Sequence, residues 1–340
     1  MRVLLTGGAG FIGSNFTNWI IENTDADLFV IDALTYAGNL DNFAQSVWDS
    51  PRFHFIKGNI CDSNVLYPLL KKVDYVIHLA AWTHIDRSLL DITPFIETNI
   101  KGTGVLLEGL RRYHVKRLVH VSTCEVYGEA KYLPIDEQHP TEPLSPYAAS
   151  KLAGEQLVQL YQKLYKIPAV ILRPFNIFGP RQYPEKLIPL FIINAMLDNP
   201  LPIYGDGTAK RDWLYVDDLL PIIWRIMEME GVEGEILNIA TGKGTTINEI
   251  SDYILNTLDK PKTLKRHVEE REGHIKQLIG SYRKVEQLLG WSPTVEFKQG
   301  LRKTITWYKE NREWWTKILR KDSYRKFVKS WYKERIQLRL

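Results

Sequence analysis

The sequence predicts an α/β protein with a doubly wound parallel sheet and a smaller second α/β lobe, and three observations support this. Through the first half of the chain, short apolar runs alternate with segments of helical periodicity, as parallel strands joined by crossover helices require. From Asn176 onward this rhythm breaks, with prolines at positions 180, 184, 189, 200 and 202. A chain of 340 residues, 44% hydrophobic and 25% charged, can also bury a sizeable core.

Each element follows from its local pattern. We expect strands at 2–6, 28–32, 53–57, 75–79, 118–122 and 169–173, where short apolar runs are bounded by polar or turn residues. We expect helices at 11–22, 63–72, 95–113 and 146–165, where apolar residues recur at helical spacing. The segment 235–240 predicts a strand that returns to the main sheet. The chain therefore divides into a first domain (1–175, with 235–240), a second lobe (176–310) and a C-terminal tail (311–340).

The positive net charge belongs to the tail. Residues 311–340 hold ten Lys/Arg and three Asp/Glu, a net of +7, which leaves the rest of the chain at −3. An acidic body argues against nucleic-acid binding. Six aromatic residues interleave with the tail's charges: Trp314, Trp315, Tyr324, Phe327, Trp331 and Tyr332. We expect a solvated or core-docked terminal helix, with attachment to an anionic membrane surface as a weaker alternative.

Cysteine usage and the N-terminus predict a cytoplasmic protein. The two cysteines, Cys61 and Cys124, form no disulfide framework and no metal-ligand spacing, so a reducing compartment and no metal are expected. The apolar start, residues 1–6, runs straight into glycines and is too short for a signal-peptide core. No apolar stretch approaches the length that spans a membrane.

A glycine-rich turn joins the first expected strand to the first helix. Its glycines, Gly7, Gly10 and Gly13, allow in turn a tight bend, close approach to a pyrophosphate and close packing of helix on strand. The pyrophosphate would sit at the positive N-terminus of the helix. Asp32 ends the second strand, where its carboxylate would bind a ribose 2′-hydroxyl and repel a 2′-phosphate. The sequence therefore predicts a Rossmann domain that binds NAD rather than NADP.

A Tyr-x-x-x-Lys pair supplies a candidate base. The spacing occurs three times, but only Tyr147 and Lys151 open a long amphipathic helix after the strand that ends near Ser122. Four residues apart, the two side chains share one helix face. A neighbouring ammonium and the positive nicotinamide would favour the phenolate of Tyr147, which could then take a proton from a sugar or alcohol hydroxyl held by Thr123.

These residues resemble the extended short-chain dehydrogenase/reductases, and in particular the dTDP-glucose 4,6-dehydratases. The glycine turn, Asp32, Ser122–Thr123 and the Tyr147/Lys151 pair carry the likeness. Further matching phrases are Leu34–Asn39, His84–Ser88, Phe95–Asn99, Pro184–Pro189, Arg211–Val216 and Arg271–His274. The resemblance covers about residues 1–310.

The resemblance implies a closed redox cycle on a nucleotide-linked hexose. NAD oxidises C4, a carboxylate removes the acidified C5 proton, water leaves from C6, and the hydride returns. Glu125 matches the C5 base, beside the catalytic Thr123, Tyr147 and Lys151. Cofactor contacts are implied for Gly7, Gly10, Phe11, Ile12, Gly13, Asp32, Asn59, Ile60, Leu79, Ala80, Ala81, Thr98, Val121, Tyr147 and Lys151. Contacts with the nucleotide sugar are implied for His84, Asn176, Lys186, Leu187, Tyr204, Arg211, Arg271 and His274, and arginine suits bidentate phosphate recognition.

The chain departs from the dehydratases at a position that matters for water loss. Those enzymes have Thr-Asp-Glu, where the Asp protonates the departing C6 hydroxyl, and this chain has Cys124 at that place. A thiol is a poor substitute for a tuned carboxylic acid. Cys124 is therefore either a member of an altered catalytic set or a small buried filler at a strand end. The chain departs from the dehydratases at three further places. Trp82 replaces a Glu, Asn59 replaces an Asp, and the sequence of residues 273–278, near the expected nucleotide, differs from the family's motif.

Three functions stay open. The first is an NAD-dependent dTDP- or UDP-hexose 4,6-dehydratase. The second is a C4-oxidising relative, either an epimerase or decarboxylase or an enzyme that handles a 5,6-unsaturated UDP-N-acetylhexosamine, since Cys-Glu resembles such offshoots. The third is a catalytically dead NAD-binding protein, which the intact set of Thr123, Glu125, Tyr147 and Lys151 disfavours. The resemblance also implies a homodimer through helices near 100–112 and 147–165.

Overall fold

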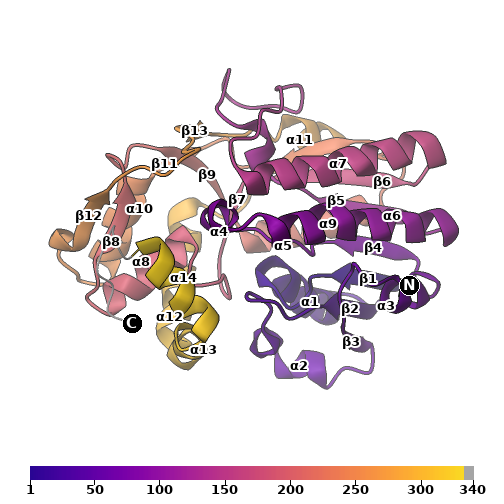
Figure 1. The fold of residues 1–340 in the computed structure, drawn as a ribbon, viewed down its shortest axis with the longest axis horizontal. Coiled ribbons are helices and arrows are strands. Elements are labelled where there is room, and N and C mark those ends of the chain that lie inside the picture. Colours follow the sequence, from indigo (N-terminus) through magenta and orange to yellow (C-terminus); the bar gives the residue numbers. More distant parts are fainter. Residues whose placement is uncertain (333–340) are drawn as a thin grey trace.

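A computed structural model describes residues 1–332 and places a large parallel sheet beside a smaller lobe (Figure 1). The last eight residues of the predicted tail, 333–340, lie outside the described residues. No helix within 1–332 has the length and apolar character needed to cross a membrane. The domain boundaries near residues 175 and 310 stay predictions.

The large sheet has seven strands in the order β10-β6-β5-β4-β1-β2-β3. All the pairs are parallel, and the order reverses beside β1, as in a doubly wound fold. Its strands are β1 (Arg2–Thr6), β2 (Asp27–Asp32), β3 (Phe53–Lys57), β4 (Tyr75–His78), β5 (Arg117–Val121), β6 (Ala169–Pro174) and β10 (Ile236–Ile239). The predicted fold class is confirmed, and the expected strand bounds differ by at most one residue at either end.

Helices cover both faces of this sheet because neighbouring strand residues point to opposite sides. In β1, Val3 and Leu5 join one apolar cluster while Leu4 joins another. The first cluster includes α1 (Phe11–Asn23), α2 (Gln45–Trp48), α9 (Val216–Glu228) and α11 (Arg283–Leu289). The second includes α3 (Ser63–Leu70), α6 (Thr103–Arg112) and α7 (Pro146–Tyr165).

The single helix expected over 95–113 is divided. A short helix α4 (Ile85–Leu90) and α5 (Thr93–Phe95) precede a π-helix over Ile96–Gly102, and α6 follows. The π-helix brings the Asn99 side chain to the loop after β4, where its amide accepts from Trp82 N at 2.9 Å and donates to Trp82 O at 3.0 Å. The same amide donates to Ser150 Oγ of α7 at 2.8 Å. The break in helical geometry therefore ties the loop beside the cleft to α7.

The second lobe holds short strands that the sequence did not resolve. β9 (Lys210–Tyr215) pairs with β11 (Gly244–Thr246), β13 (Gln277–Leu278) and β7 (Asn176–Phe178). β8 (Leu201–Tyr204) pairs with β12 (Lys265–Val268). Helices α8 (Leu187–Met196) and α10 (Ile247–Thr257) pack against them, and short 3-10 turns lie at Leu40–Asn42, Cys124–Tyr127 and Lys262–Leu264.

Three helices end the described chain: α12 (Phe297–Glu310), α13 (Arg312–Leu319) and α14 (Asp322–Tyr332). Figure 1 shows them in yellow, between the second lobe and the large sheet. All six aromatic residues of the tail are buried in the core of the second lobe, so the core-docked helix is what forms. Because these rings are buried, they are not available to insert into a membrane surface, and only the basic charges of the tail still favour membrane contact.

Candidate active site

The glycine turn has the geometry that the motif requires. Gly7 has φ +72°, and a Cβ there would lie 2.7 Å from Ala80 Cα. A Cβ on Gly13 would lie 2.2 Å from Gly7 O, so helix and turn touch there. A Cβ on Gly10 would meet only Gly7 O, at 3.4 Å, which leaves its outer side open to an approaching ligand. The first N–H groups of α1 face this open side, where a pyrophosphate binds well.

Asp32 stands at the end of β2 and is held by the backbone. Its two oxygens accept from Ala9 N at 2.9 Å and Leu34 N at 2.8 Å. Burial raises the pKa of this carboxyl, and the two backbone hydrogen bonds oppose that rise. The carboxylate is therefore fixed beside the glycine turn, where a ribose hydroxyl would meet it.

One cavity of ≈ 420 Å³ runs from this turn to the second lobe, and every residue assigned to a site from the sequence lines it. At the cofactor end these are Gly7, Gly10, Phe11, Ile12, Gly13, Asp32, Asn59, Ile60, Leu79, Ala80, Ala81, Thr98 and Val121. In the middle lie Thr123, Cys124, Glu125, Tyr147 and Lys151. At the other end lie His84, Asn176, Lys186, Leu187, Tyr204, Arg211, Arg271 and His274. The structure thus brings the three predicted sets together, while their individual roles stay predictions.

Tyr147 and Lys151 are placed by the start of α7. Ser145 caps the helix by accepting from Ala148 N at 3.1 Å, and Pro146 occupies the first helical position. Tyr147 therefore sits in the first turn, facing the cleft. One turn later, Lys151 Nζ donates to Val121 O at the end of β5, at 2.7 Å. The helix is thus pinned to the strand that carries Thr123.

The expected phenolate is not produced by the protein's own groups. Burial raises the pKa of Tyr147, and its hydrogen bond with Thr123 only partly opposes this. The Lys151 ammonium is held on a strand carbonyl, and burial lowers its pKa to about 8. In the protein alone, desolvation therefore sets the direction in which the pKa of Tyr147 shifts, and a phenolate favoured by Lys151 together with the nicotinamide stays a prediction.

Cys124 and Glu125 follow Thr123 in a 3-10 turn, Cys124–Tyr127. Thr123 Oγ1 accepts from Glu125 N at 3.3 Å and so caps that turn. Cys124 is 2% exposed and packs in a small apolar cluster with Val126 and Tyr127. Burial, and then the Glu125 carboxylate, raise the pKa of its thiol well above the usual value. Cys124 is thus a protonated thiol in the wall of the cleft.

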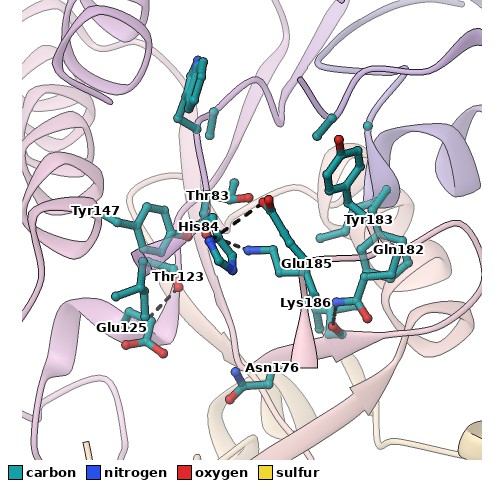
Figure 2. Close-up of a pocket in the computed structure, with 18 of the residues that line it drawn as sticks. Thr83, His84, Thr123, Glu125, Tyr147, Asn176, Gln182, Tyr183, Glu185 and Lys186 are labelled. Carbon is teal, nitrogen blue, oxygen red and sulfur yellow. Dashed lines mark hydrogen bonds and ion pairs between the residues drawn. The ribbon is translucent and has the colours of Figure 1, made fainter. Parts of the chain in front are cut away.

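Across the cleft stand residues of the loop after β4 and of the segment before α8. In Figure 2, Tyr147, Thr123 and Glu125 lie on one side, and His84, Glu185 and Lys186 face them. Lys186 Nζ donates to Thr83 O at 2.8 Å, and burial lowers its pKa to about 8. Burial, Lys186 and Arg87 lower the pKa of His84, so its imidazole is neutral.

The far end of the cleft is lined by buried cations. Arg211 is 7% exposed and donates from Nη1 to Lys210 O at 3.0 Å. Arg271 pairs with Asp86 of α4, and the Tyr204 hydroxyl donates to the same carboxylate at 3.3 Å. Together the two arginines form an end of the cleft that suits a diphosphate, although Asp86 already balances part of the charge on Arg271.

Comparisons with known proteins agree with this geometry. The profile of the GDP-mannose 4,6 dehydratase family matches residues 4–304. The chain belongs to this family. It is 40% identical over 322 residues to the dTDP-glucose 4,6-dehydratase of an Actinoplanes species, covering 93% of this chain and 100% of that protein. It is 39% identical over 308 residues to the low-salt glycan biosynthesis protein Agl12 of Haloferax volcanii, covering 91% and 98%.

Solved structures of this extended short-chain dehydrogenase/reductase group superpose closely. The dTDP-glucose 4,6-dehydratase DesIV of Streptomyces venezuelae, crystallised with NAD bound, has a TM-score of 0.91 at 40% identity, over 94% of this chain and 100% of that chain. The UDP-glucuronic acid 4-epimerase of Bacillus cereus, also with NAD, has a TM-score of 0.86 at 34% identity, over 91% and 99%. Dehydratases and epimerases therefore share the scaffold.

Within this family fold, the sequence patterns assigned no role to three residues at the cleft: Asp86 and Glu185, which line it, and Arg87, which binds Glu185. Asp86 binds Arg271 and Tyr204, and Glu185 accepts from Arg87 Nε at 2.7 Å with its own side chain fully buried. All three stand inside phrases that carried the resemblance, His84–Ser88 and Pro184–Pro189. The signal was therefore present, but the pairing between the two phrases is tertiary and no periodicity reveals it.

Trp82, the second departure from the dehydratases, also lines the cleft. Its ring lies 4.8 Å from that of Tyr36 and 5.7 Å from that of Phe95, between centres. Where the resembled dehydratases carry a carboxylate, this member of the family has an aromatic wall beside the catalytic residues.

Proposed function

We propose that the chain is an NAD-dependent enzyme of the 4,6-dehydratase type that acts on a dTDP- or UDP-linked hexose. The observation that carries the proposal is the single cleft. It joins a dinucleotide turn, a Thr-Tyr-Lys set with an adjacent carboxylate, and a cationic end formed by Arg211 and Arg271. These match, in order along the cleft, a nicotinamide dinucleotide, a reacting sugar and a diphosphate.

The residues at the cofactor end fit NAD. The open side of Gly10 and the uncapped N–H groups of α1 suit its pyrophosphate, and Asp32 suits an adenosine ribose with a free 2′-hydroxyl. When bound, NAD supplies a hydride acceptor and, later, a hydride donor. Lys151 and Thr98 line the passage from that end to the catalytic residues.

The chain's own residues move the protons. Tyr147, hydrogen-bonded with Thr123, would accept the proton of the C4 hydroxyl as a phenolate, a form that the positive charge of a bound nicotinamide favours. The resulting C4 ketone acidifies the C5–H bond, and the Glu125 carboxylate takes that proton. The C6–O bond then breaks, and the proton on Glu125 leaves with the hydroxide as water. The hydride then adds to C6, and C5 takes a proton that Glu125 has regained from solvent, while Tyr147 releases to solvent the proton that it took from the C4 hydroxyl.

A second function is favoured by one observation, the buried thiol at position 124. No carboxylic acid stands where the resembled dehydratases place the acid for C6, and Cys124 is protonated and packed in apolar surroundings. A C4-oxidising epimerase, a decarboxylase, or an enzyme that handles a 5,6-unsaturated UDP-N-acetylhexosamine would not need that acid. The epimerases among the similar structures support the first of these alternatives.

A panel of nucleotide hexoses separates these functions. The chain, supplied with NAD, is incubated with dTDP-glucose, UDP-glucose, UDP-N-acetylglucosamine and UDP-glucuronic acid, and products are weighed by mass spectrometry. The proposal expects loss of one water without net NADH. A product of unchanged mass would instead support epimerisation, and loss of carbon dioxide would support decarboxylation. Tight NAD binding with no product from any sugar would leave a catalytically dead binding protein.

We also propose a homodimer and a cytoplasmic location. On α7, three large apolar side chains are exposed: Leu160 at 47%, Leu164 at 57% and Tyr165 at 46%. α6 lies alongside, so a second copy could bury both helices (Figure 1). Two cysteines without a disulfide suit a reducing compartment. Light scattering tests the dimer, and Leu164→Glu should shift it to the monomer mass.

A further inference from the structure

The C-terminal helix α14 reaches the substrate end of the cleft, although the family profile ends at residue 304. Tyr332 lines the cavity. Phe327 and Trp331 are buried behind it, and each contacts side chains that stand at the cavity. The aromatic half of the tail is therefore part of the wall around the substrate end.

Phe327 packs on the residues of α4 and of the turn before it. The Arg87 guanidinium carbon lies 4.2 Å from the centre of the Phe327 ring and 4.2 Å from the centre of the Tyr36 ring. The Phe327 ring also meets His84 edge-on, at 5.3 Å between centres. Arg87 in turn donates to Glu185. One ring of α14 thus contacts both the neutral imidazole in the cleft and the cation that holds Glu185.

Trp331 contacts Tyr204, a residue of the second lobe that lines the same end of the cavity. Its indole Nε1 donates to the Tyr204 hydroxyl at 2.7 Å, and that hydroxyl donates to Asp86 at 3.3 Å. Asp86 is 3% exposed and also binds Arg271, whose guanidinium lies 5.8 Å from the Tyr204 ring centre. A buried carboxylate with these partners depends on each of them for its position.

We propose that α14 is a latch that joins the two sides of the substrate end, with Phe327 and Trp331 as positioning residues. Tyr36, His84, Asp86 and Arg87 belong to the first half of the chain, while Tyr204 and Arg271 belong to the second. α14 contacts both groups at once and so supports the direct pairing of Asp86 with Arg271 and Tyr204. Since the ligand's identity rests on the proposed function, the consequence is that α14 controls affinity for the nucleotide sugar and leaves NAD binding alone.

Three variants test the latch. Trp331→Phe keeps an aromatic ring but removes the donor to Tyr204, and Phe327→Leu keeps an apolar side chain but removes the ring over Arg87. Val328→Ala is the matched control, because Val328 is buried in the same helix but has neither the ring that Phe327 places on His84 and Arg87 nor the donor that Trp331 offers to Tyr204. Each is compared with the full-length wild type for KM and kcat on the turned-over sugar, for Kd of UDP, dTDP and NAD by calorimetry, and for melting temperature.

If α14 is a latch, Trp331→Phe and Phe327→Leu should each raise KM or the nucleotide Kd by about threefold to tenfold. This is the effect expected from the loss of one hydrogen bond or ring contact. NAD affinity and kcat should stay within twofold of wild type. Val328→Ala should lower the melting temperature without changing KM or nucleotide Kd. If all three variants only lower the melting temperature, α14 is a packing element and the latch is wrong.

A second readout separates the latch from the proposed function. Hydrogen–deuterium exchange over residues 84–90 needs no substrate, and the latch expects faster exchange there in Trp331→Phe and Phe327→Leu but not in Val328→Ala. Unchanged exchange in that segment overturns the latch even if the enzyme turns over a sugar. A wild type that binds neither UDP nor dTDP defeats the proposed function, while the exchange result still decides whether α14 positions α4.

Discussion

The helix that carries Tyr147 and Lys151, the predicted catalytic pair, is anchored by one buried ion pair, and breaking that pair should destabilise the fold. Glu155 lies on α7, one turn after Lys151, and binds the Arg173 guanidinium of β6 through both of its oxygens. The side chains are 0% and 4% exposed. Arg173 also lies 4.8 Å from the Tyr127 ring centre. The pair therefore fixes the rotation of α7 against the sheet.

Arg173→Met leaves the Glu155 carboxylate buried without its cation, a change that costs about 3–5 kcal/mol. An exposed pair on the same face, Lys101 with Glu97, is 57% and 53% exposed, and Lys101→Met should cost less than about 0.5 kcal/mol. Urea unfolding of both variants measures the difference. The double variant Arg173→Met/Glu155→Met removes both charges and should recover at least about 1 kcal/mol of the loss.

A cost for Arg173→Met no larger than that for Lys101→Met would show that the buried pair does not anchor α7. The anchoring would also be refuted by a double variant whose loss equals the sum of the single losses, since that would mean the two residues do not interact. Turnover gives a further check, because a rotated α7 displaces Tyr147 and Lys151 together. The Arg173→Met variant should therefore lose activity at temperatures where it is still folded.

Three further changes have expected outcomes. Tyr147→Phe should lower turnover by about 10²–10⁴-fold while the Kd for NAD and for nucleotide stays within twofold, measured by steady-state kinetics and calorimetry. Gly13→Ala forces a Cβ to 2.2 Å from Gly7 O and should abolish measurable NAD binding, whereas Gly104→Ala, whose Cβ meets open space among the described residues, should bind NAD normally. Burial lowers the pKa of Lys151 from 10.5 to about 8, so between these pH values the unfolded chain binds more protons than the folded one. The stability of the wild type should therefore rise by up to about 3 kcal/mol relative to Lys151→Met as pH increases through that window, and parallel melting-temperature profiles for the two proteins would contradict this.

The sequence predicted the large sheet well because its signals are local. Apolar runs of four to six residues mark buried parallel strands, and the glycine turn fixes which strand comes first and which end of the sheet binds the cofactor. Tyr147 was separated from two other tyrosines with the same spacing by its position after β5. The structure places it in the first turn of α7, where that argument needs it.

What local patterns could not reveal were contacts between distant segments. The pairing of Asp86 with Arg271 joins residues 185 positions apart, and the sequence around either residue contains no pattern that predicts it. The direction in which the pKa of Tyr147 shifts in the protein alone is a similar case. Charge counting along the helix placed an ammonium nearby, but the burial that dominates its pKa comes from packing of the whole cleft. The aromatic tail was ambiguous until its rings were placed against α4 and β8.

Cys124 narrows the chemistry that the site can perform. A thiol whose pKa burial raises is a poor source of the proton that a tuned carboxylic acid would supply, so under the proposed function Glu125 would both remove the C5 proton and release it to the departing C6 oxygen. That sequence balances, because one proton arrives on Glu125 and one leaves. It also requires both bonds to break on the face of the sugar that Glu125 occupies. The loss of a dedicated acid lowers the rate of water loss, by about 10²–10⁴-fold if it is not compensated, but leaves oxidation at C4 untouched. A site without a dedicated acid favours substrates whose conversion depends mainly on oxidation at C4. Whether a given sugar loses water at C6 therefore distinguishes the candidate substrates.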